Sequence, residues 1–262
     1  MKKEDSRFVV DNVFEGMVSV RTLIENRSRY VAGLSKNDRA IQKVYYEAAR
    51  ADSNRAEFLW LTHRAEEQGF ILEKTDAAFI QSITVGSQHG GVVALADNRT
   101  IPRINEAELS SNGFYVMLEG IEDPYNFGYA LRSLYASGVD GVILTPRNWM
   151  TAAGVVCRAS AGASELLPLY TSTPDEAVSV MKNAGYRIVC ADLRESVSLF
   201  DADLSYPIFL IIGGEKRGIS RSVLSHADLR VHIDYAREFS ASLSAASAAT
   251  IAGYEIFRYN RY

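Results

Sequence analysis

The second half of the sequence alternates short apolar runs with helix-forming stretches, and this alternation restricts the fold more than any other feature. Strands that are apolar throughout and are joined through helices are typical of a parallel sheet covered on both faces. We therefore predict an α/β domain whose ligands gather in the loops that follow the carboxyl ends of its strands. The apolar runs are FYVMLEG, VDGVILT, YRIVCADL, YPIFLIIGGE and LRVHIDY, and the helix-forming stretches between them are NFGYALRSLYASG, PDEAVSVMKNAG and KRGISRSVLSHA.

A long helix is predicted at the end of the chain, from about Ser242 to Tyr259. Five of its residues fall on one stripe at helical spacing, which predicts that this stripe packs against the sheet. The stripe consists of Leu243, Ser247, Thr250, Tyr254 and Phe257.

The first hundred residues have a different character and predict a separate small domain of mixed helix and strand. The region from Phe14 to about Glu67 is mostly helix-forming, and its segment 37–69, which ends at Gly69, has apolar residues at helical spacing. Strands are predicted at FILEK and at Val92 to Ala96, followed by a polar linker at about 98–112. We expect two domains, over residues 1–105 and 106–262.

Composition indicates a cytoplasmic protein. The two cysteines among the 262 residues, Cys157 and Cys190, each lie in an apolar stretch, which favours reduced buried thiols over a disulfide. The amino-terminal segment MKKEDSRFVVDNVF has acidic residues in place of an apolar core. No apolar run approaches the ~20 residues that span a bilayer, so neither secretion nor membrane insertion is predicted.

Nucleic-acid binding through overall charge is excluded, because the formal net charge is −4. A local basic patch remains compatible with that charge. Arg21, Arg27 and Arg29 lie close together with only Glu25 among them. They predict either a small RNA-binding patch or a solvated helix face.

The loop GGEKRG follows the predicted strand Ile208 to Ile212 and precedes a helix, so its glycines could bring backbone amides close to a ligand. It is not a nucleoside triphosphate loop, because Ile219 and Ser220 stand where lysine and serine or threonine are required. A G-x-G-x-x-G dinucleotide motif is also missing after the first strand, where the chain reads EGIEDPYNFG. The four histidines show no metal-ligand spacing with the cysteines, and no metal is expected.

The segment EDPYNFGYALRSLYASG contains two polar residues that are candidates for a functional site, Asn126 and Arg132. Asn126 lies in the turn between strand and helix, where it acts either as a helix cap or as a site residue. Arg132 lies further along the helix among apolar residues, and its guanidinium requires a carboxylate, a phosphate or water. It forms either a structural salt bridge or part of a site.

Three segments in a fixed order resemble the SpoU branch of the SPOUT RNA methyltransferases. They are EDPYNFGYALRSLYASGVDGVIL, LIIGGEKRGIS and VHIDYAREFSASLSAASAATIAGYE, and the small-residue stretch CRASAGASELLPL lies between the first two. The resemblance covers roughly residues 112–262. GSQHGGVVALAD is similar to the end of a substrate-binding domain, akin to a ribosomal protein, that many members carry in front.

The resemblance implies a trefoil knot in the carboxy-terminal α/β domain, an obligate homodimer and bound S-adenosyl-L-methionine. The knot is one of the few exceptions to unknotted chains. By position in the motifs, the expected cofactor-binding residues are Ile212, Gly213, Gly214, Ile233 and Leu243.

The resemblance also implies methyl transfer to a ribose 2′-hydroxyl in structured RNA, with rRNA favoured over tRNA. Arg132 would stand at the reacting hydroxyl, where it uses a neighbouring RNA phosphate or acts as the base itself, and the phosphate role is favoured because a guanidinium is rarely deprotonated. Asn126 would orient the site. Glu215 would bind Arg132 or hold the knot loop, although it could equally cap the following helix. Ser244 stands where the family usually has asparagine, and is expected at the substrate hydroxyl.

The chain departs from the family in one further place, where Asp234 and Tyr235 replace the common Pro-Met pair in a loop one residue longer than usual. Two other functions stay open, the first because of Ser244 and this altered loop, and the second because of the acidic sequence pI near 5.7. One is a non-catalytic RNA-binding or ribosome-assembly protein of the same fold. The other is a small-molecule methyltransferase or another nucleotide-binding enzyme.

Overall fold

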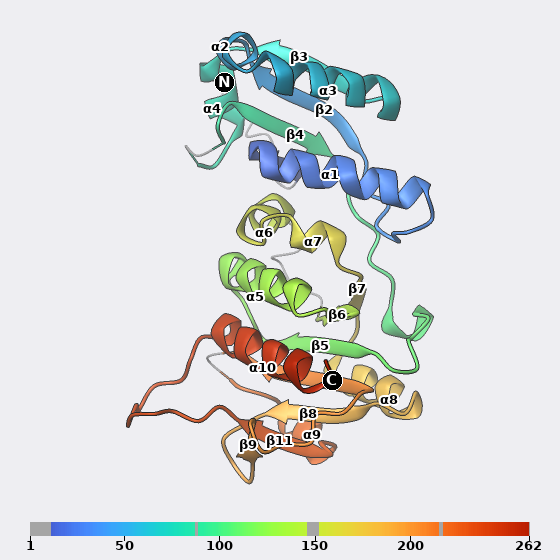
Figure 1. Cartoon of the computed structure of the whole chain (residues 1–262), viewed down its shortest axis with the longest axis vertical. Coiled ribbons are helices and arrows are strands. Elements are labelled where there is room, and N and C mark those ends of the chain that lie inside the picture. Colours follow the sequence, from blue (N-terminus) through green and yellow to red (C-terminus); the bar gives the residue numbers. More distant parts are fainter. Residues whose placement is uncertain (1–11, 87–88, 146–151, 215–216, 262) are drawn as a thin grey trace, which may run out of the picture. The chain divides into compact units, whose positions relative to one another are not determined.

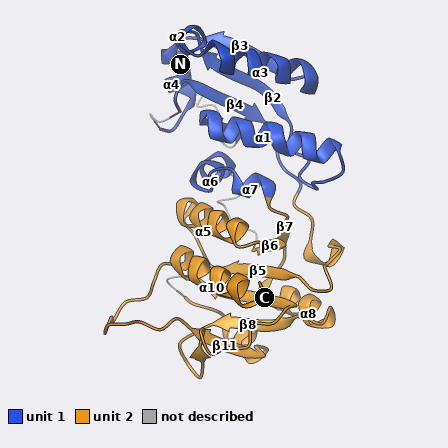
Figure 2. Cartoon of the chain, viewed as in Figure 1, with its two compact units in different colours: residues 1–100, 148–166 blue, residues 101–147, 167–262 orange. Residues whose placement is uncertain are grey.

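The computed structural model describes residues 12–86, 89–145, 152–214 and 217–261, and the chain forms two compact units (Figures 1 and 2). The first unit contains residues 1–100 and 148–166, and the second contains residues 101–147 and 167–262. The predicted domain division after residue 105 stays a prediction, because the first compact unit combines segments from both sides of it.

The first unit is built on a four-stranded sheet with the order β1-β4-β2-β3, in which only β2 and β3 run parallel. The strands are β1 (Val13–Glu15), β2 (Ile41–Glu47), β3 (Ile71–Thr75) and β4 (Val92–Ala96). The helices are α1 (Gly16–Val31), α2 (Ala48–Ser53), α3 (Arg55–Gln68), α4 (Ala77–Ile83), α6 (Ala153–Ala159) and α7 (Ala163–Leu166).

The helix predicted over residues 37–69 is wrong in its first part, which contains β2. Val44 and Tyr46 are both fully buried and are two residues apart, so the buried positions follow the two-residue period of a strand. Adjacent tyrosines also favour a pleated, half-buried surface. The end of the helical region at Gly69 is confirmed, because Gly69 caps α3 in the left-handed conformation with φ of 78°.

A buried ion pair attaches α7 to the rest of the first unit. Arg39 Nε lies 3.0 Å from Glu165 Oε2, and both side chains are almost completely buried. Asn37 donates a second hydrogen bond of 2.9 Å to the same carboxylate oxygen, and Arg39 Nη1 donates to the backbone oxygen of Asp97. Since each charge is paired and hydrogen-bonded, the cost of burying it is offset.

The second unit contains a seven-stranded sheet with the order β7-β6-β5-β10-β8-β11-β9, and every pair in it is parallel. The predicted parallel α/β domain is confirmed. The strands are β5 (Phe114–Glu119), β6 (Gly141–Leu144), β7 (Leu169–Thr171), β8 (Arg187–Ala191), β9 (Val197–Ser198), β10 (Ile208–Gly213) and β11 (Leu229–His232). The helices are the 3-10 helix η2 (Ile104–Glu106), α5 (Pro124–Ala136), α8 (Pro174–Asn183), α9 (Arg221–Ser225) and α10 (Ala245–Tyr259).

Helices cover both faces of this sheet, as the apolar strands predict. Alternate residues of the central strands, such as Met117, Cys190 and Phe209, form one core with α8 and α9. On the other face, α10 packs on β10 and against α5. Strand β10 lies between β5 and β8, which precede it in the chain. The trefoil knot is implied by the fold family rather than by this strand order alone.

The predicted buried stripe of the last helix is wrong for Ser247 and for its two aromatic residues, all of which are exposed. Tyr254 and Phe257 are 47% and 38% exposed, and α10 instead buries small residues such as Ala249 and Gly253. A Cβ at position 253 would lie 2.8 Å from Ser137 Oγ, so glycine allows α10 to approach α5 closely. Close helix packing through small residues leaves the aromatic side chains outside the contact.

Both cysteines are free and buried, as predicted. Burial raises the pKa of the Cys190 thiol to about 12, which keeps it protonated and unreactive at neutral pH. None of the helices in the described residues is long and apolar enough to cross a membrane.

Removing one partner of the buried ion pair is expected to destabilise the first unit strongly. We expect Glu165→Gln to lower the free energy of unfolding by about 3–5 kcal/mol, because Arg39 would keep a buried charge without its carboxylate. Glu67→Gln is the matched control, since its pair with Arg64 is exposed and such pairs contribute at most about 1 kcal/mol. Urea unfolding followed by tryptophan fluorescence measures both. A second change, Arg39→Met, should recover part of the loss, and equal losses for Glu165→Gln and Glu67→Gln would contradict the argument.

Candidate functional site

A cavity of about 470 Å³ opens at the carboxyl edge of the sheet in the second unit. Its walls are formed by the residues that follow β8, the ends of β10 and β11, and the segment that leads into α10. This is the edge at which ligands of parallel α/β sheets bind. Ile212, Gly213, Gly214, Ile233 and Leu243 all line it. The structure thus brings together the five residues expected to bind a cofactor, and their role stays a prediction.

Glycines form the wall of the cavity after β10 because no larger residue fits there. A Cβ on Gly214 would lie 2.3 Å from the backbone oxygen of Gly120, and a Cβ on Gly213 would lie 2.4 Å from the backbone carbon of Gly218. Gly218 adopts φ of 63° and donates a 2.9 Å hydrogen bond to the oxygen of Gly214. These contacts close a tight turn and leave backbone rather than side chains at the wall.

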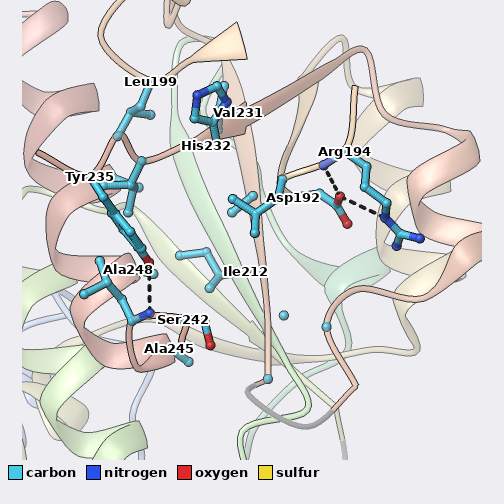
Figure 3. Close-up of a pocket in the computed structure, with 18 residues that line it drawn as sticks. Asp192, Arg194, Leu199, Ile212, Val231, His232, Tyr235, Ser242, Ala245 and Ala248 are labelled. Atoms are coloured by element: carbon cyan, nitrogen blue, oxygen red, sulfur yellow. Dashed lines mark hydrogen bonds and ion pairs between the residues drawn. The ribbon is translucent and has the colours of Figure 1, made fainter. Parts of the chain in front are cut away.

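A charged pair lies on the opposite side of the cavity from Tyr235, with Ile212 between them (Figure 3). Asp192 directly follows β8, and its side chain is 12% exposed. Its Oδ1 accepts a 2.8 Å hydrogen bond from the backbone amide of Arg194 and lies 3.5 Å from Arg194 Nε. This side of the cavity can therefore meet polar or charged parts of a ligand.

The loop after β11 is held by polar contacts at its first residues. His232 Nε2 lies 3.3 Å from Asp234 Oδ1, and His232 Nδ1 lies 2.9 Å from Ser196 Oγ. The Ser198 hydroxyl also donates to Asp234, and this hydrogen bond holds the pKa of the Asp234 carboxyl below its ordinary value. Asp234 is thus charged at neutral pH and fixes the start of the loop.

The structure at the start of α5 shows that Asn126 is not the helix cap. Asp123 is the N-cap, because its Oδ2 accepts a 2.8 Å hydrogen bond from the backbone amide of Asn126. Asn126 is the third residue of the helix and does not line the cavity. The prediction that it caps the helix is wrong, and its role in orienting the site stays a prediction.

Arg132 lies two turns into α5 with its side chain exposed, and it is not part of the cavity wall. Within the described ranges of the chain, no carboxylate forms an ion pair with it, so they give no support to a structural salt bridge. An exposed guanidinium at this place can bind an external anion.

Ser244 is the N-cap of α10, and its side chain accepts a 3.1 Å hydrogen bond from the backbone amide of Ser247. It stands between Leu243 and Ala245, which both line the cavity. Serine and asparagine are both favoured N-caps, so the replacement of the usual asparagine preserves this function. Glu215, the fourth expected catalytic residue, lies outside the described residues.

Helices α5 and α10 lie side by side and run in the same direction (Figure 1). Thr250 Oγ1 donates a 2.7 Å hydrogen bond to Ser133 Oγ, and one turn later Gly253 lies against Ser137. Both helices therefore begin at the carboxyl edge of the sheet, which places Asn126 and Ser244 at the same edge as the cavity.

The three arginines of α1 do not form one patch. Arg21 lies 4.6 Å from the Trp60 ring and 3.9 Å from Glu57. Arg27 stacks over Tyr30 at 5.3 Å. Arg27 and Arg29 differ by about 200° at ~100° per residue, so they project from opposite sides of the helix. RNA binding by these residues stays a prediction.

Sequence reasoning missed Asp192, His232 and Tyr235, which all line the cavity. Asp192 had a usable signal, because a carboxylate directly after an apolar strand lies at the ligand edge of a parallel sheet. In the described parts of the chain, no group of three or more histidine, cysteine, aspartate or glutamate side chains could hold a metal ion.

Comparison with known proteins gives a consistent result. The model of the SpoU rRNA Methylase family matches residues 113–254. A Staphylococcus saprophyticus relative, whose name places it in the TrmH family of tRNA/rRNA methyltransferases, is 35% identical over 148 residues. That match covers 56% of this chain and 59% of the relative, which is less than two thirds of its length. YacO of Bacillus subtilis, named for the same family, is 26% identical over 85% of this chain and 90% of its own.

Solved structures show the same fold. An rRNA methyltransferase from Sinorhizobium meliloti with bound AdoMet has a TM-score of 0.78 and 19% identity, and the match covers 98% of this chain and 97% of that chain. An RNA 2′-O ribose methyltransferase has a TM-score of 0.76 and 19% identity, over 94% of this chain and 88% of that chain.

The capping role of Ser244 predicts a specific order of stabilities. We expect Ser244→Ala to lower the free energy of unfolding by about 0.5–2 kcal/mol, because the amide of Ser247 loses its acceptor. Ser244→Asn should leave stability nearly unchanged, since asparagine also caps. Thermal unfolding monitored by circular dichroism tests this, with Ser240→Ala in the preceding exposed segment as control. Equal midpoints for the alanine and asparagine variants would show that the cap contributes nothing.

Proposed function

Since the chain belongs to the SpoU rRNA methylase family, we propose that it is an S-adenosylmethionine-dependent methyltransferase that modifies a ribose 2′-hydroxyl in rRNA. The observation that carries the proposal is that one cavity is lined by all five residues at the family's cofactor positions. They come from three separate segments of the chain. These segments are the end of β10, the residue that follows β11 and the residues just before α10.

The cavity fits this cofactor in size and chemistry. Its volume of about 470 Å³ lies in the range of small-molecule sites. Ile212, Ile233 and Leu243 offer apolar surface to a flat base. The backbone of Gly213 and Gly214 carries no side chain and is available for hydrogen bonds with polar ligand atoms. When bound, S-adenosylmethionine supplies an electrophilic methyl group on a sulfonium sulfur.

Arg132 is assigned to the RNA rather than to the cofactor. A ribose hydroxyl is a very weak acid, so it must be held in line with the methyl group and helped to lose its proton. A guanidinium is almost never deprotonated, so Arg132 acts by binding a phosphate next to the reacting ribose and by favouring the developing negative charge. Its exposure and the missing ion-pair partner among the described residues support this role.

The substrate class rests on the relatives. The matched family model is named for rRNA, and the S. meliloti neighbour is an rRNA methyltransferase. The choice of the 2′-hydroxyl is supported by the neighbour named as an RNA 2′-O ribose methyltransferase. The free buried cysteines agree with a reducing compartment, and we propose the cytoplasm.

We also propose that the protein acts as a homodimer through the aromatic surface of α5 and α10. Tyr125 and Tyr129 on α5, and Tyr254 and Phe257 on α10, are between 38% and 51% exposed. Exposed aromatic side chains gathered on neighbouring helices indicate a protein interface. Arg132 follows Tyr125 by seven residues and so lies on the same side of α5. Dimerisation would therefore carry Arg132 toward the partner subunit and its cavity.

The proposed function predicts that a change at Arg132 slows methyl transfer without weakening cofactor binding. We expect the wild-type protein to bind S-adenosylmethionine with a micromolar Kd and to methylate rRNA from a strain that lacks the gene. Arg132→Ala should leave this Kd unchanged and slow methyl transfer on the order of 10²–10³-fold, because an interaction of the transition state is lost. Calorimetry gives the first quantity. Incorporation of labelled methyl groups, located by resistance of the adjoining phosphodiester to alkali, gives the second.

Two outcomes would contradict this proposal. Normal cofactor binding without methylation of any cellular RNA would favour the non-catalytic RNA-binding function. Alkali-sensitive product would place the methyl group on a base instead of the ribose.

The dimer proposal predicts complementation between two inactive variants. One subunit carries Arg132→Ala and the other carries Gly214→Val, whose side chain would overlap the Gly120 backbone and distort the cavity wall. If Arg132 serves the partner's cavity, mixed dimers contain one intact site and regain activity, while each variant alone stays inactive. Sedimentation confirms that the subunits mix. Mixed dimers without activity would place Arg132 at the cavity of its own subunit.

A further inference from the structure

We infer that Tyr235 stacks on the adenine base of the cofactor and so determines which end of the cavity the base occupies. This inference rests on the proposed function and concerns the orientation of the ligand within the same site.

The Tyr235 side chain is held in place from two directions within its own loop. Its hydroxyl accepts a 3.1 Å hydrogen bond from the backbone amide of Leu243, eight residues later. Its ring lies 6.0 Å from the ring of Phe239 at an interplanar angle of 56°. The side chain still lines the cavity, so a ligand meets an aromatic surface whose orientation is already fixed. Such preorganisation lowers the entropic cost of binding.

The backbone of Tyr235 is fixed as well. The preceding Asp234 is tied to Ser198 and lies against His232, so the chain is anchored on the side of β9 and β11. The hydrogen bond to Leu243 anchors it on the side of α10. Residues 236–242 between these anchors are all exposed. Tyr235, which is itself 39% exposed, therefore stands at the fixed base of this exposed loop.

The two ends of the cavity differ in chemistry, and this difference orients the ligand. Figure 3 shows Tyr235 and Ala248 on one side and the Asp192–Arg194 pair on the other. The base of S-adenosylmethionine has flat apolar faces, whereas its ribose and amino-acid parts carry hydroxyl and charged groups. The base therefore fits the aromatic end, and the polar parts point toward Asp192. Stacking of a base on an aromatic ring commonly accounts for a large part of such affinity.

Calorimetric titration of the full-length protein with two ligands tests the assignment. S-adenosylmethionine is compared with 5′-methylthioadenosine, which keeps the base, ribose and sulfur but lacks the amino-acid group. We expect Tyr235→Ala to weaken both ligands by about tenfold or more, because both lose the stacked ring. Tyr235→Phe keeps the ring and should weaken both only about fivefold or less, through loss of the hydroxyl contact. Arg237→Ala, in the same exposed loop but outside the cavity wall, should change neither Kd.

A spectroscopic variant guards against a folding defect in the alanine protein. Tyr235→Trp keeps an aromatic ring, and its added fluorescence should be quenched by 5′-methylthioadenosine beyond any quenching in the wild-type protein.

Three outcomes would overturn the inference. Unchanged affinities in Tyr235→Ala would show that the ring does not contact the ligand. Weaker binding of S-adenosylmethionine alone would place Tyr235 at the amino-acid end. A wild-type protein that binds neither ligand would overturn the proposed function and this inference together, which distinguishes it from the first two results.

Discussion

The close approach of glycine backbones at the end of β10 is the constraint on which the rest of the site depends. Gly214 touches the backbone of Gly120 after β5, and Gly213 touches Gly218 after the turn. Because β10 lies beside β5, a side chain at position 214 would push these two strands apart at their carboxyl edge, and a side chain at position 213 would collide with the backbone of Gly218. The same contact that closes the sheet therefore also leaves bare backbone facing the cavity.

The packing of α10 on α5 connects this edge to the surface. Small residues bring the helices together, and the Thr250–Ser133 hydrogen bond holds them in a common direction. As a result both helices begin beside the cavity, while the aromatic residues Tyr129 and Tyr254 stay exposed. One packing arrangement thus sets the position of the Ser244 cap and leaves an apolar surface available for a second subunit.

The sequence predicts the parallel sheet because apolar strands joined through helices form a local pattern, whereas the five cofactor positions come from the resemblance to the family, and their role stays a prediction. Strands that are apolar throughout can be recognised from their composition. In a parallel sheet the residues that follow such strands all lie at the carboxyl edge. Tyr235 was missed because its place in the cavity depends on the fold of its own loop, which the hydrogen bond from Leu243 holds, whereas Asp192 had a local signal in its position directly after an apolar strand. The error at Ile41–Glu47 has another cause. Flanking helix formers extended a helical pattern across a strand in which the buried residues Val44 and Tyr46 are two positions apart. The exposure of Tyr254 and Phe257 could not be foreseen, since apolar residues on one stripe do not reveal whether the same chain or another covers them.

The contrast between Arg39 and Arg132 shows how burial separates structural from functional charges. Arg39 is buried, paired with Glu165 and hydrogen-bonded to the Asp97 backbone, so its charge is fully used within the fold. Arg132 is exposed on a helix that begins at the ligand edge, with no ion-pair partner in the described ranges. A charge that the fold does not use is available to a ligand, and in the proposed function that ligand is a phosphate of the RNA. In the sequence Arg39 directly follows Asn37 and Asp38, whereas Arg132 lies among apolar residues, and only their surroundings in the folded chain show which charge is paired.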